Sequence, residues 1–207
     1  MSFITFEGIE GCGKSTQWRR LAARLGERAV VTREPGGTAI GRGVRELLLD
    51  PANGALSPMA ELLLYFADRA QNVAEVIRPA LGRGLTVLCD RHVESSLAYQ
   101  GYGRGLPLDA IHELAALATG GLRPDLIVLV DVPVEVGLAR VGKRGAHDRL
   151  EAEVRDFHER VRAGYESLRT EEPSRWLRLD GTASEDAVFE GLWSGLVARG
   201  LVEEARP

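Results

Sequence analysis

The feature that most constrains this chain is the octapeptide Gly8-Ile9-Glu10-Gly11-Cys12-Gly13-Lys14-Ser15 near its N-terminus. It matches the pattern G-x-x-x-x-G-K-[ST] at every fixed position. The residues before it, 3–7, predict a strand, and residues 15–25 predict a helix. In such a frame the glycines let backbone N–H groups curl around phosphate oxygens at a helix N-terminus. The sequence therefore predicts a phosphate-binding loop (P-loop) between a strand and a helix.

The rest of the chain alternates between strand-like and helical patterns. The predicted strands are 3–7, 29–32, 85–90, 126–131 and 176–179, and each is short and apolar. The predicted helices are 15–25, 41–49, a long one from Pro58 toward Leu81, 109–119, 133–141, 150–168 and 184–199. Because strands alternate with helices, we expect an α/β fold with a mostly parallel sheet covered on both faces. No linker or repeat divides the chain, so we expect one domain over residues 1–207.

The composition excludes several classes of protein. Hydrophobic residues make up 44% and charged residues 27%, as in ordinary soluble globular proteins. No apolar run approaches the roughly 18 residues that cross a bilayer, and no leader-like segment precedes the first strand. The two cysteines, Cys12 and Cys89, have no metal-binding or disulfide spacing. We therefore expect a cytoplasmic protein with no membrane partner.

Charge is distributed unevenly. The net charge of −4 argues against an extended surface for a nucleic-acid polymer. Between positions 140 and 149, however, four basic residues stand against one acidic residue: Arg140, Lys143, Arg144 and Arg149 against Asp148. Such a patch on an acidic protein indicates a small anionic ligand. From the residues alone, a solvated charged turn explains it equally well.

The P-loop suggests a role for each of its polar residues. Lys14 would reach the β- and γ-phosphates of a nucleotide, and the Ser15 hydroxyl would bind Mg²⁺. The loop alone does not distinguish a kinase from a GTPase switch or an ATP-driven machine. The chain lacks the Asn-Lys-x-Asp and D-x-x-G motifs of GTPases and is too short for a mechanical domain. A nucleoside or nucleotide kinase is favoured, with ATP bound by Gly8, Ile9, Glu10, Gly11, Cys12, Gly13, Lys14, Ser15 and Thr16.

Further motifs follow the P-loop in a fixed order. They are Thr32-Arg33-Glu34-Pro35-Gly36-Gly37-Thr38, Tyr65-Phe66-Ala67-Asp68-Arg69, Asp90-Arg91-His92, Ser95-Ser96-Leu97-Ala98-Tyr99-Gln100-Gly101 and Asp148-Arg149-Leu150-Glu151. Together with Glu7-Gly8-Ile9-Glu10-Gly11, they closely resemble the thymidylate kinases of the bacterial type, from about residue 3 to residue 168. The resemblance implies a three-layer α/β/α fold of the P-loop nucleoside monophosphate kinase type, with a five-stranded parallel sheet in the order 2-3-1-4-5. It also implies phosphorylation of dTMP to dTDP by ATP and Mg²⁺, in dTTP biosynthesis, by a homodimer.

The resemblance assigns the catalytic residues. Asp90, at the end of a strand, would hold Mg²⁺ or its water shell, and Arg91 would bridge the acceptor and transferred phosphates. The segment 140–150 is similar to a lid that closes over ATP. The P-loop has no basic residue after Glu10, so a lid arginine would supply the charge at the transition state. We predict Arg144 for that role and Arg149 as a second candidate, with Arg140 stacked on adenine.

The resemblance also assigns the acceptor site. Arg45, which alone would be read as a surface arginine, would grip the acceptor phosphate beside Pro35, whose peptide bond we expect to be restricted or cis. Tyr65 and Arg69 are four residues apart and share a helix face, where they suit a pyrimidine base; a core position is the alternative for Tyr65. Ser96 would read the base edge, Tyr99 would lie under the sugar, and Glu10 would accept a hydrogen bond from the 3′-hydroxyl.

Four alternatives stay open from the sequence. One is action on a deoxynucleoside or another monophosphate, although Arg45 and Arg91 favour a monophosphate. Another is a non-catalytic nucleotide sensor, although a sensor needs no lid arginine. Cys12, at a helix N-terminus, suggests a redox-sensitive thiolate, with a small filler of a variable position as the alternative. Leu62, Leu63 and Leu64 are a candidate dimer seam or core positions.

Overall fold

The sheet has five parallel strands in the order β2-β3-β1-β4-β5. The computed structural model describes residues 1–143, 148–151 and 153–202. Its strands are β1 (Phe3–Glu7), β2 (Ala29–Arg33), β3 (Thr86–Asp90), β4 (Leu126–Asp131) and β5 (Trp176–Asp180). All five coincide with predicted strands to within one residue at each end, and the expected strand order is confirmed.

The central strands are buried on both faces. Every residue of β1 is buried, and so are the first five of β4. The edge strands β2 and β5 are only partly covered. The apolar run of β4 suits a strand that has helices above and below it.

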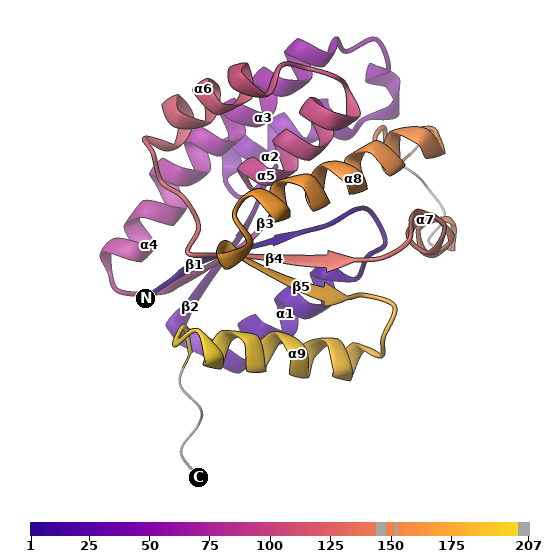
Figure 1. Ribbon diagram of the computed structural model, residues 1–207. Coiled ribbons are helices and arrows are strands. Elements are labelled where there is room, and N and C mark those ends of the chain that lie inside the picture. Colours follow the sequence, from indigo (N-terminus) through magenta and orange to yellow (C-terminus); the bar gives the residue numbers. More distant parts are fainter. Residues whose placement is uncertain (144–147, 152, 203–207) are drawn as a thin grey trace.

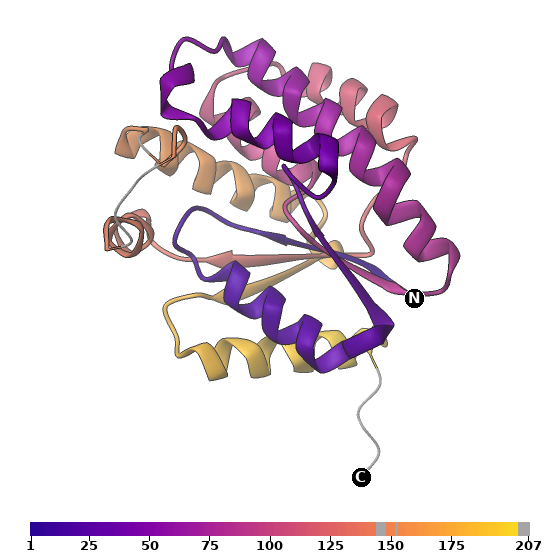
Figure 2. The same cartoon turned by 180° about the vertical axis from the view of Figure 1, so that it is seen from behind.

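Helices cover the two faces of the sheet (Figure 1). On one face lie α1 (Lys14–Leu25) and α9 (Glu185–Ala198), which contact each other. The opposite layer contains α2 (Ala39–Leu49), α3 (Pro58–Asn72), α4 (Arg78–Gly82), α5 (Val93–Ser96), α6 (Leu108–Thr119) and α8 (Arg155–Glu171). The view from behind shows the same two layers, with α7 (Val134–Gly142) beyond the end of β4 (Figure 2). The three-layer α/β/α architecture is thereby confirmed.

The predicted helix signals act as expected. Ser57 caps α3, where its hydroxyl accepts a hydrogen bond from the backbone N–H of Ala60, and Pro58 occupies the first turn. Gly120 ends α6 in the left-handed conformation, with φ of 56°. A π-helical turn over Val73–Ile77 joins α3 to α4. The helical stretch therefore runs from Pro58 to Gly82, the extent predicted.

Two parts of the prediction were wrong. The helix expected from residue 150 begins only at Arg155, because the Asp148 carboxylate accepts hydrogen bonds from the backbone N–H groups of Leu150 and Glu151 and closes a turn there. The sequence analysis also missed α5 and the π-helical segment Leu97–Gly103 that continues it. That segment packs against α8, and both border the site described below.

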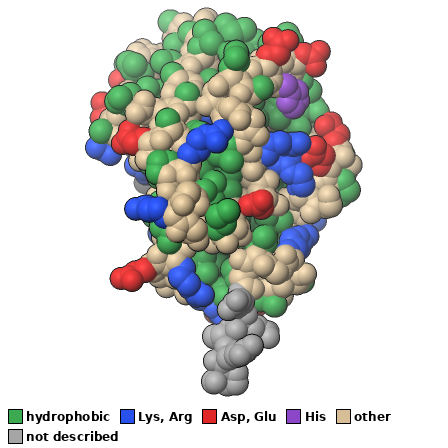
Figure 3. Space-filling model, turned by 90° about the vertical axis from the view of Figure 1, so that its left-hand side faces the viewer, with side chains coloured by type: hydrophobic (Ala, Val, Ile, Leu, Met, Phe, Trp, Pro, Cys, Tyr) green, Lys and Arg blue, Asp and Glu red, His purple; other side chains and the backbone are tan. Residues whose placement is uncertain are grey.

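The surface carries exposed hydrophobic side chains on the upper helical layer. Figure 3 shows such side chains gathered over this layer, with charged groups between them. Leu63 is 49% exposed, whereas Leu62 is completely buried. Of the two interpretations of residues 62–64, a dimer seam or core positions, the core position is confirmed for Leu62. Among the described residues, no helix is long and apolar enough to cross a membrane.

Candidate active site

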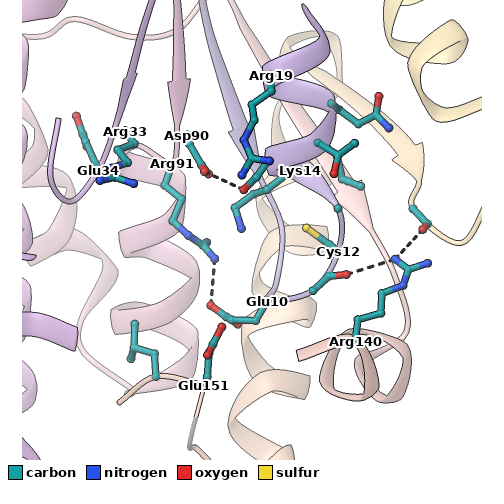
Figure 4. A pocket seen from close by; sticks show the side chains of 18 of the residues that line it. Glu10, Cys12, Lys14, Arg19, Arg33, Glu34, Asp90, Arg91, Arg140 and Glu151 are labelled. Carbon is teal, nitrogen blue, oxygen red and sulfur yellow. Dashed lines mark hydrogen bonds and ion pairs between the residues drawn. The ribbon is translucent and has the colours of Figure 1, made fainter. Parts of the chain in front are cut away.

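The P-loop lies at the carboxyl end of the central strand β1, against a cavity of about 640 Å³. The segments that follow β2, β3, β4 and β5 also line this cavity. Ligands of parallel α/β sheets bind at this edge, and the volume is that of a small-molecule site. Figure 4 shows Lys14, from the P-loop, and Asp90 and Arg91, from the end of β3, directed toward the same space.

The glycines of the P-loop are required by their surroundings. Gly8 has φ of +136°, and a Cβ there would collide with the carbonyl oxygen of Val130 on β4. Gly11 has φ of +69°, and its Cβ would collide with the carbonyl oxygen of Gly137 on α7. Only glycine fits such positions, so the loop is held tightly against β4 and α7.

Ser15 and Asp90, both predicted metal ligands, lie side by side. The Ser15 hydroxyl donates to Asp90 Oδ2 at 3.3 Å (Figure 4). The second carboxylate oxygen, Oδ1, is buried without a hydrogen-bond partner in the described structure. A buried carboxylate oxygen without a donor suits a cation or its water shell. The described residues contain no group of three or more His, Cys, Asp or Glu side chains that could hold a metal. Mg²⁺ here would depend on phosphate oxygens and water, as it commonly does.

Arg91 brings two further predicted residues together. Its Nη2 donates to Glu10 Oε1 and to the Tyr99 hydroxyl, both at 3.0 Å, and the Tyr99 hydroxyl donates to Glu10 Oε1 at 2.6 Å. The Arg91 guanidinium also lies 4.7 Å from the centroid of the Tyr99 ring. Three residues from the P-loop, the end of β3 and the π-helical segment thus form one polar cluster.

The Glu10 carboxylate is kept ionised by its neighbours. Burial acts to raise its pKa, but His158, Arg91 and Lys14 oppose this effect and lower the pKa to about 2. His158 Nδ1 lies 3.4 Å from Glu10 Oε2. Glu10 is therefore a hydrogen-bond acceptor over the whole working range of pH, as a contact with a substrate hydroxyl requires.

Arg69 and Ser96 are in direct contact, beside a second and smaller cavity. Arg69 Nη1 donates to Ser96 Oγ at 3.0 Å, and Nη2 donates to the His92 carbonyl oxygen at 2.7 Å. Tyr65 and Tyr99 line the same cavity. The four residues predicted to recognise a base and sugar are thus neighbours.

Glu34 is the buried counterion of Arg69. Arg69 Nε donates to Glu34 Oε2 at 2.7 Å, and both side chains are about 1% exposed. Burial acts to raise the pKa of Glu34, but His92 and Arg69 lower it to about 2. Arg33, the residue before Glu34, lines the main cavity.

Arg45 lies beside Pro35 on the wall of the main cavity. Its Nη1 donates to the Pro35 carbonyl oxygen at 2.9 Å, and the Glu34–Pro35 peptide bond is cis, as expected. Burial and the neighbouring Arg33 lower the pKa of the Arg45 guanidinium. Two cations on one wall repel each other, and an anion between them would relieve that repulsion.

A family model described as thymidylate kinase matches residues 6–191. The chain belongs to the thymidylate kinase family. Thymidylate kinase of Deinococcus radiodurans is 53% identical over 201 residues, which cover 96% of this chain and 97% of the relative. Thymidylate kinase of Geobacter sulfurreducens is 54% identical over 206 residues, covering 95% and 97%.

A solved structure agrees with the family assignment. The crystal structure of thymidylate kinase from Ehrlichia chaffeensis superposes with a TM-score of 0.77 at 32% identity, and covers 94% of this chain and 98% of that one. The fold and the order of the motifs are thus shared along nearly the whole chain.

Arg140 contacts the backbone of the P-loop. Its Nη1 donates to the carbonyl oxygens of Gly11 and Gly181, at 3.3 and 3.0 Å. The thymidylate kinase resemblance suggested that Arg140 stacks on adenine. In this structure its observed contacts are with the backbone, at the rim of the cavity that it helps to line.

The two predicted lid arginines differ. Arg144 lies outside the described residues. Arg149 is buried, its Nη2 lies 2.5 Å from Glu61 Oε2, and its Nε donates to the Leu48 carbonyl oxygen at 2.9 Å. Arg149 is not among the residues that line the main cavity. The structure brings Lys14, Asp90 and Arg91 together but directs Arg149 into the α2–α3 layer.

The redox hypothesis for Cys12 is corrected by the structure. The side chain is 1% exposed, and burial raises the pKa of the thiol. A helix N-terminus favours thiolate only where the charge is solvated or paired, and here desolvation dominates. Cys12 is a small buried side chain beside Gly8.

Three residues that contact the site were missed: Glu61, His158 and Tyr165. His158 and Tyr165 are both on α8, seven positions apart, and therefore share one face of the helix. A polar pair on the buried face of an amphipathic helix was the one available signal. Glu61 carried a similar signal, because it is an acidic residue directly before the apolar run Leu62-Leu63-Leu64.

Proposed function

We propose that this chain transfers the γ-phosphoryl group of ATP to dTMP, with Mg²⁺, to give ADP and dTDP. Membership of the thymidylate kinase family supports this reaction and places it in dTTP biosynthesis. The observation that carries the assignment of roles is the cluster of Arg91 with Glu10 and Tyr99 beside the P-loop. Its cation lies beside the P-loop, and this position supports a role for Arg91 between the donor and acceptor phosphates.

The donor end consists of the P-loop, Lys14 and the Ser15–Asp90 pair. Backbone N–H groups of the loop and the Lys14 ammonium would hold the β- and γ-phosphates. The Mg²⁺ ion would supply positive charge that offsets the negative charge of the phosphates. Ser15 Oγ and the unpartnered Oδ1 of Asp90 are the protein groups that would hold the ion or its water.

The acceptor end is built for a deoxynucleoside monophosphate. Arg45 and Arg91, with Arg33 nearby, would bind the acceptor phosphate. Tyr65 would stack on the pyrimidine, while Arg69 and Ser96 would donate to its edge. Glu10 would accept from the 3′-hydroxyl, and the Tyr99 ring would crowd a 2′-hydroxyl.

Chemistry at this site depends on alignment and charge rather than on a general base. Arg91 and Lys14 would stabilise negative charge on the transferred phosphoryl group. We propose that Arg144 from the lid adds the third cation. Arg149, which pairs with Glu61, would fix the end of the lid segment and not contact phosphate.

We also propose that the protein is a cytoplasmic homodimer. The family resemblance suggests the dimer, and exposed Leu47, Met59 and Leu63 on α2 and α3 offer an apolar surface for it. Light scattering after gel filtration should give twice the mass of the 22.5 kDa chain. A monomer at all protein concentrations would overturn this part of the proposal.

The test of the reaction is ADP release with ATP and Mg²⁺ across dTMP, dUMP, dGMP, dCMP, thymidine and no acceptor. We expect rapid turnover with dTMP, slower turnover with dUMP and none with thymidine. The missing methyl group of dUMP is worth about 1–3 kcal/mol, so weak activity should remain. Faster turnover on dGMP would refute the pocket assignment, and ATP binding without turnover on any acceptor would refute the kinase.

A further inference from the structure

Arg91 uses all four hydrogens of its two Nη groups within the protein. Nη2 donates to Glu10 and Tyr99, and Nη1 donates to the hydroxyls of Ser95 and Tyr165, both at 3.1 Å. A guanidinium has five N–H donors, so only Nε–H is left without an internal partner in the described structure. To bind phosphates through its Nη groups, Arg91 must therefore give up some of these contacts.

The two Nη groups face different surroundings. Glu10, on the Nη2 side, lines the main cavity, whereas Tyr165, on the Nη1 side, is 1% exposed and lines neither of the two cavities described above. Tyr165 comes from α8, which packs against the π-helical segment Leu97–Gly103. Glu10 is thus at the surface that a substrate would reach and Tyr165 is in the interior, while Tyr99 and Ser95 line the smaller cavity.

The hydroxyls behind Arg91 are oriented by a buried carboxylate. Ser95 Oγ donates to Glu7 Oε2 at 2.5 Å, and Tyr165 Oη donates to the same oxygen at 3.1 Å. Each hydroxyl has one proton. When both protons are directed to Glu7, both hydroxyls present only lone pairs to Arg91. Glu7 is completely buried and also accepts from the His92 backbone N–H at 2.8 Å.

We infer that Tyr165 is a positioning residue for phosphoryl transfer, holding Nη1 of Arg91 while Nη2 exchanges Glu10 and Tyr99 for phosphate oxygens. This inference rests on the proposed function. The backbone of Arg91 has φ of +73°, an uncommon value for a residue other than glycine. The side-chain end is then fixed by Tyr165 and Ser95. Without the Tyr165 hydroxyl, the guanidinium is held mainly from the Glu10 side and is drawn away from the phosphates.

The test compares Tyr165→Phe with Tyr102→Phe. Both tyrosines form hydrogen bonds at the contact between α8 and the preceding helical segments, but the Tyr102 hydroxyl donates to Ser167 at 2.9 Å, away from Arg91. Tyr165→Phe should lower kcat about 10-fold or more, as expected for loss of a hydrogen bond to a charged group, and leave the KM for ATP unchanged. Tyr102→Phe should leave both constants unchanged. Equal losses in the two variants would show a structural role only and overturn the inference.

A double-mutant cycle shows whether Tyr165 acts through Arg91. In an Arg91→Lys background the Tyr165 hydroxyl has lost the group it positions, so Tyr165→Phe should have less than a 2-fold further effect on kcat. A 10-fold loss in that background as well would overturn the inference. The wild type serves as the reference: if it does not phosphorylate dTMP, the proposed function fails, whereas a wild type that turns over beside an unaffected Tyr165→Phe refutes only this inference.

A crystal structure of the wild type with dTMP keeps the inference testable even if Tyr165→Phe does not fold. We expect the Nη1 contacts with Tyr165 and Ser95 to persist while Nη2 contacts the acceptor phosphate. A guanidinium that leaves Tyr165 in the complex would overturn the inference.

Discussion

Arg149 and Glu61 form a buried ion pair that links the end of the predicted lid segment, residues 140–150, to helix α3. Arg149 Nη2 lies 2.5 Å from Glu61 Oε2, with side chains 8% and 1% exposed. Arg104 Nη2 approaches the same oxygen at 3.2 Å, and Gln100 donates to Oε1 at 2.8 Å. One carboxylate on α3 thus balances two arginines from two distant segments.

Removing the Glu61 charge should destabilise the protein. Glu61→Gln leaves the buried Arg149 without its carboxylate partner, whereas Arg104 keeps Glu153 at 2.6 Å, and breaking a buried pair in this way costs about 3–5 kcal/mol. Urea unfolding at pH 7 measures the loss. Glu166→Gln is the matched control, because Glu166 pairs with Arg169 on the exposed side of α8 and should change the unfolding free energy by at most about 1 kcal/mol. Equal, small effects would contradict the buried-pair account.

The two lid arginines should separate catalysis from stability. Arg144→Ala should lower kcat about 10³-fold or more at an unchanged melting temperature, because a cation at the transition state is lost. Arg149→Ala should lower the melting temperature, because Glu61 loses its closest partner. Lys143→Ala, on the neighbouring residue, is the kinetic control. Undiminished turnover in Arg144→Ala would show that Arg144 does not stabilise the transition state.

Turnover should require Mg²⁺ and depend on Asp90. Chelation by EDTA should abolish ADP release, and Asp90→Asn should raise the Mg²⁺ concentration for half-maximal rate about 10- to 100-fold. Asp131→Asn is a matched control, since Asp131 also ends a strand but pairs with Arg162 and Arg178. The same Mg²⁺ dependence in wild type and Asp90→Asn would disprove the assignment.

Cys12 should be inert in the folded protein. Its thiol is buried, and burial raises its pKa, so little thiolate forms at neutral pH. Mass spectrometry after iodoacetamide at pH 7 should find Cys12 unmodified in the native protein and alkylated after unfolding in guanidinium. Rapid alkylation of the native protein, lost in Cys12→Ser, would restore the redox hypothesis.

Asp68 should make stability depend on pH. Burial raises its pKa from 3.8 to about 7, and the Gly36 N–H is its one hydrogen-bond donor in the described structure. The folded protein therefore keeps a proton that the unfolded chain releases near pH 4. This contribution to stability is complete below pH 4 and is lost as the pH rises to 7. Unfolding free energies of wild type and Asp68→Asn should diverge across that window, and parallel curves would refute the shift.

The sequence predicted well those features that depend on a few consecutive residues. The P-loop, the strand ends at Asp90 and the cap at Ser57 each depend on neighbouring residues, so pattern and spacing identify them. The resemblance to a family then supplied the strand order and residues such as Arg45, whose role no local pattern indicates.

Features that depend on packing between distant segments were not predictable. Tyr165 meets Arg91 only because α8 packs against the π-helical segment Leu97–Gly103, which the sequence analysis missed. Arg149 was read as part of a basic patch, but a charge pattern cannot show that its side chain turns toward Glu61. For Cys12 the sequence left two interpretations open, and it could not show the burial that favours the small filler.

The central place of β1 in the sheet separates the two halves of the ligand site along the chain. Glu34, Arg69 and the ends of β2 and β3 lie on one side of the P-loop, while Arg140 and Gly181 lie on the other. Changes at acceptor-side residues such as Arg69 and Ser96 can therefore occur without altering the P-loop, Asp90 or Arg140. An ancestral chain with this strand order could exchange one acceptor for another while it kept a working donor site throughout.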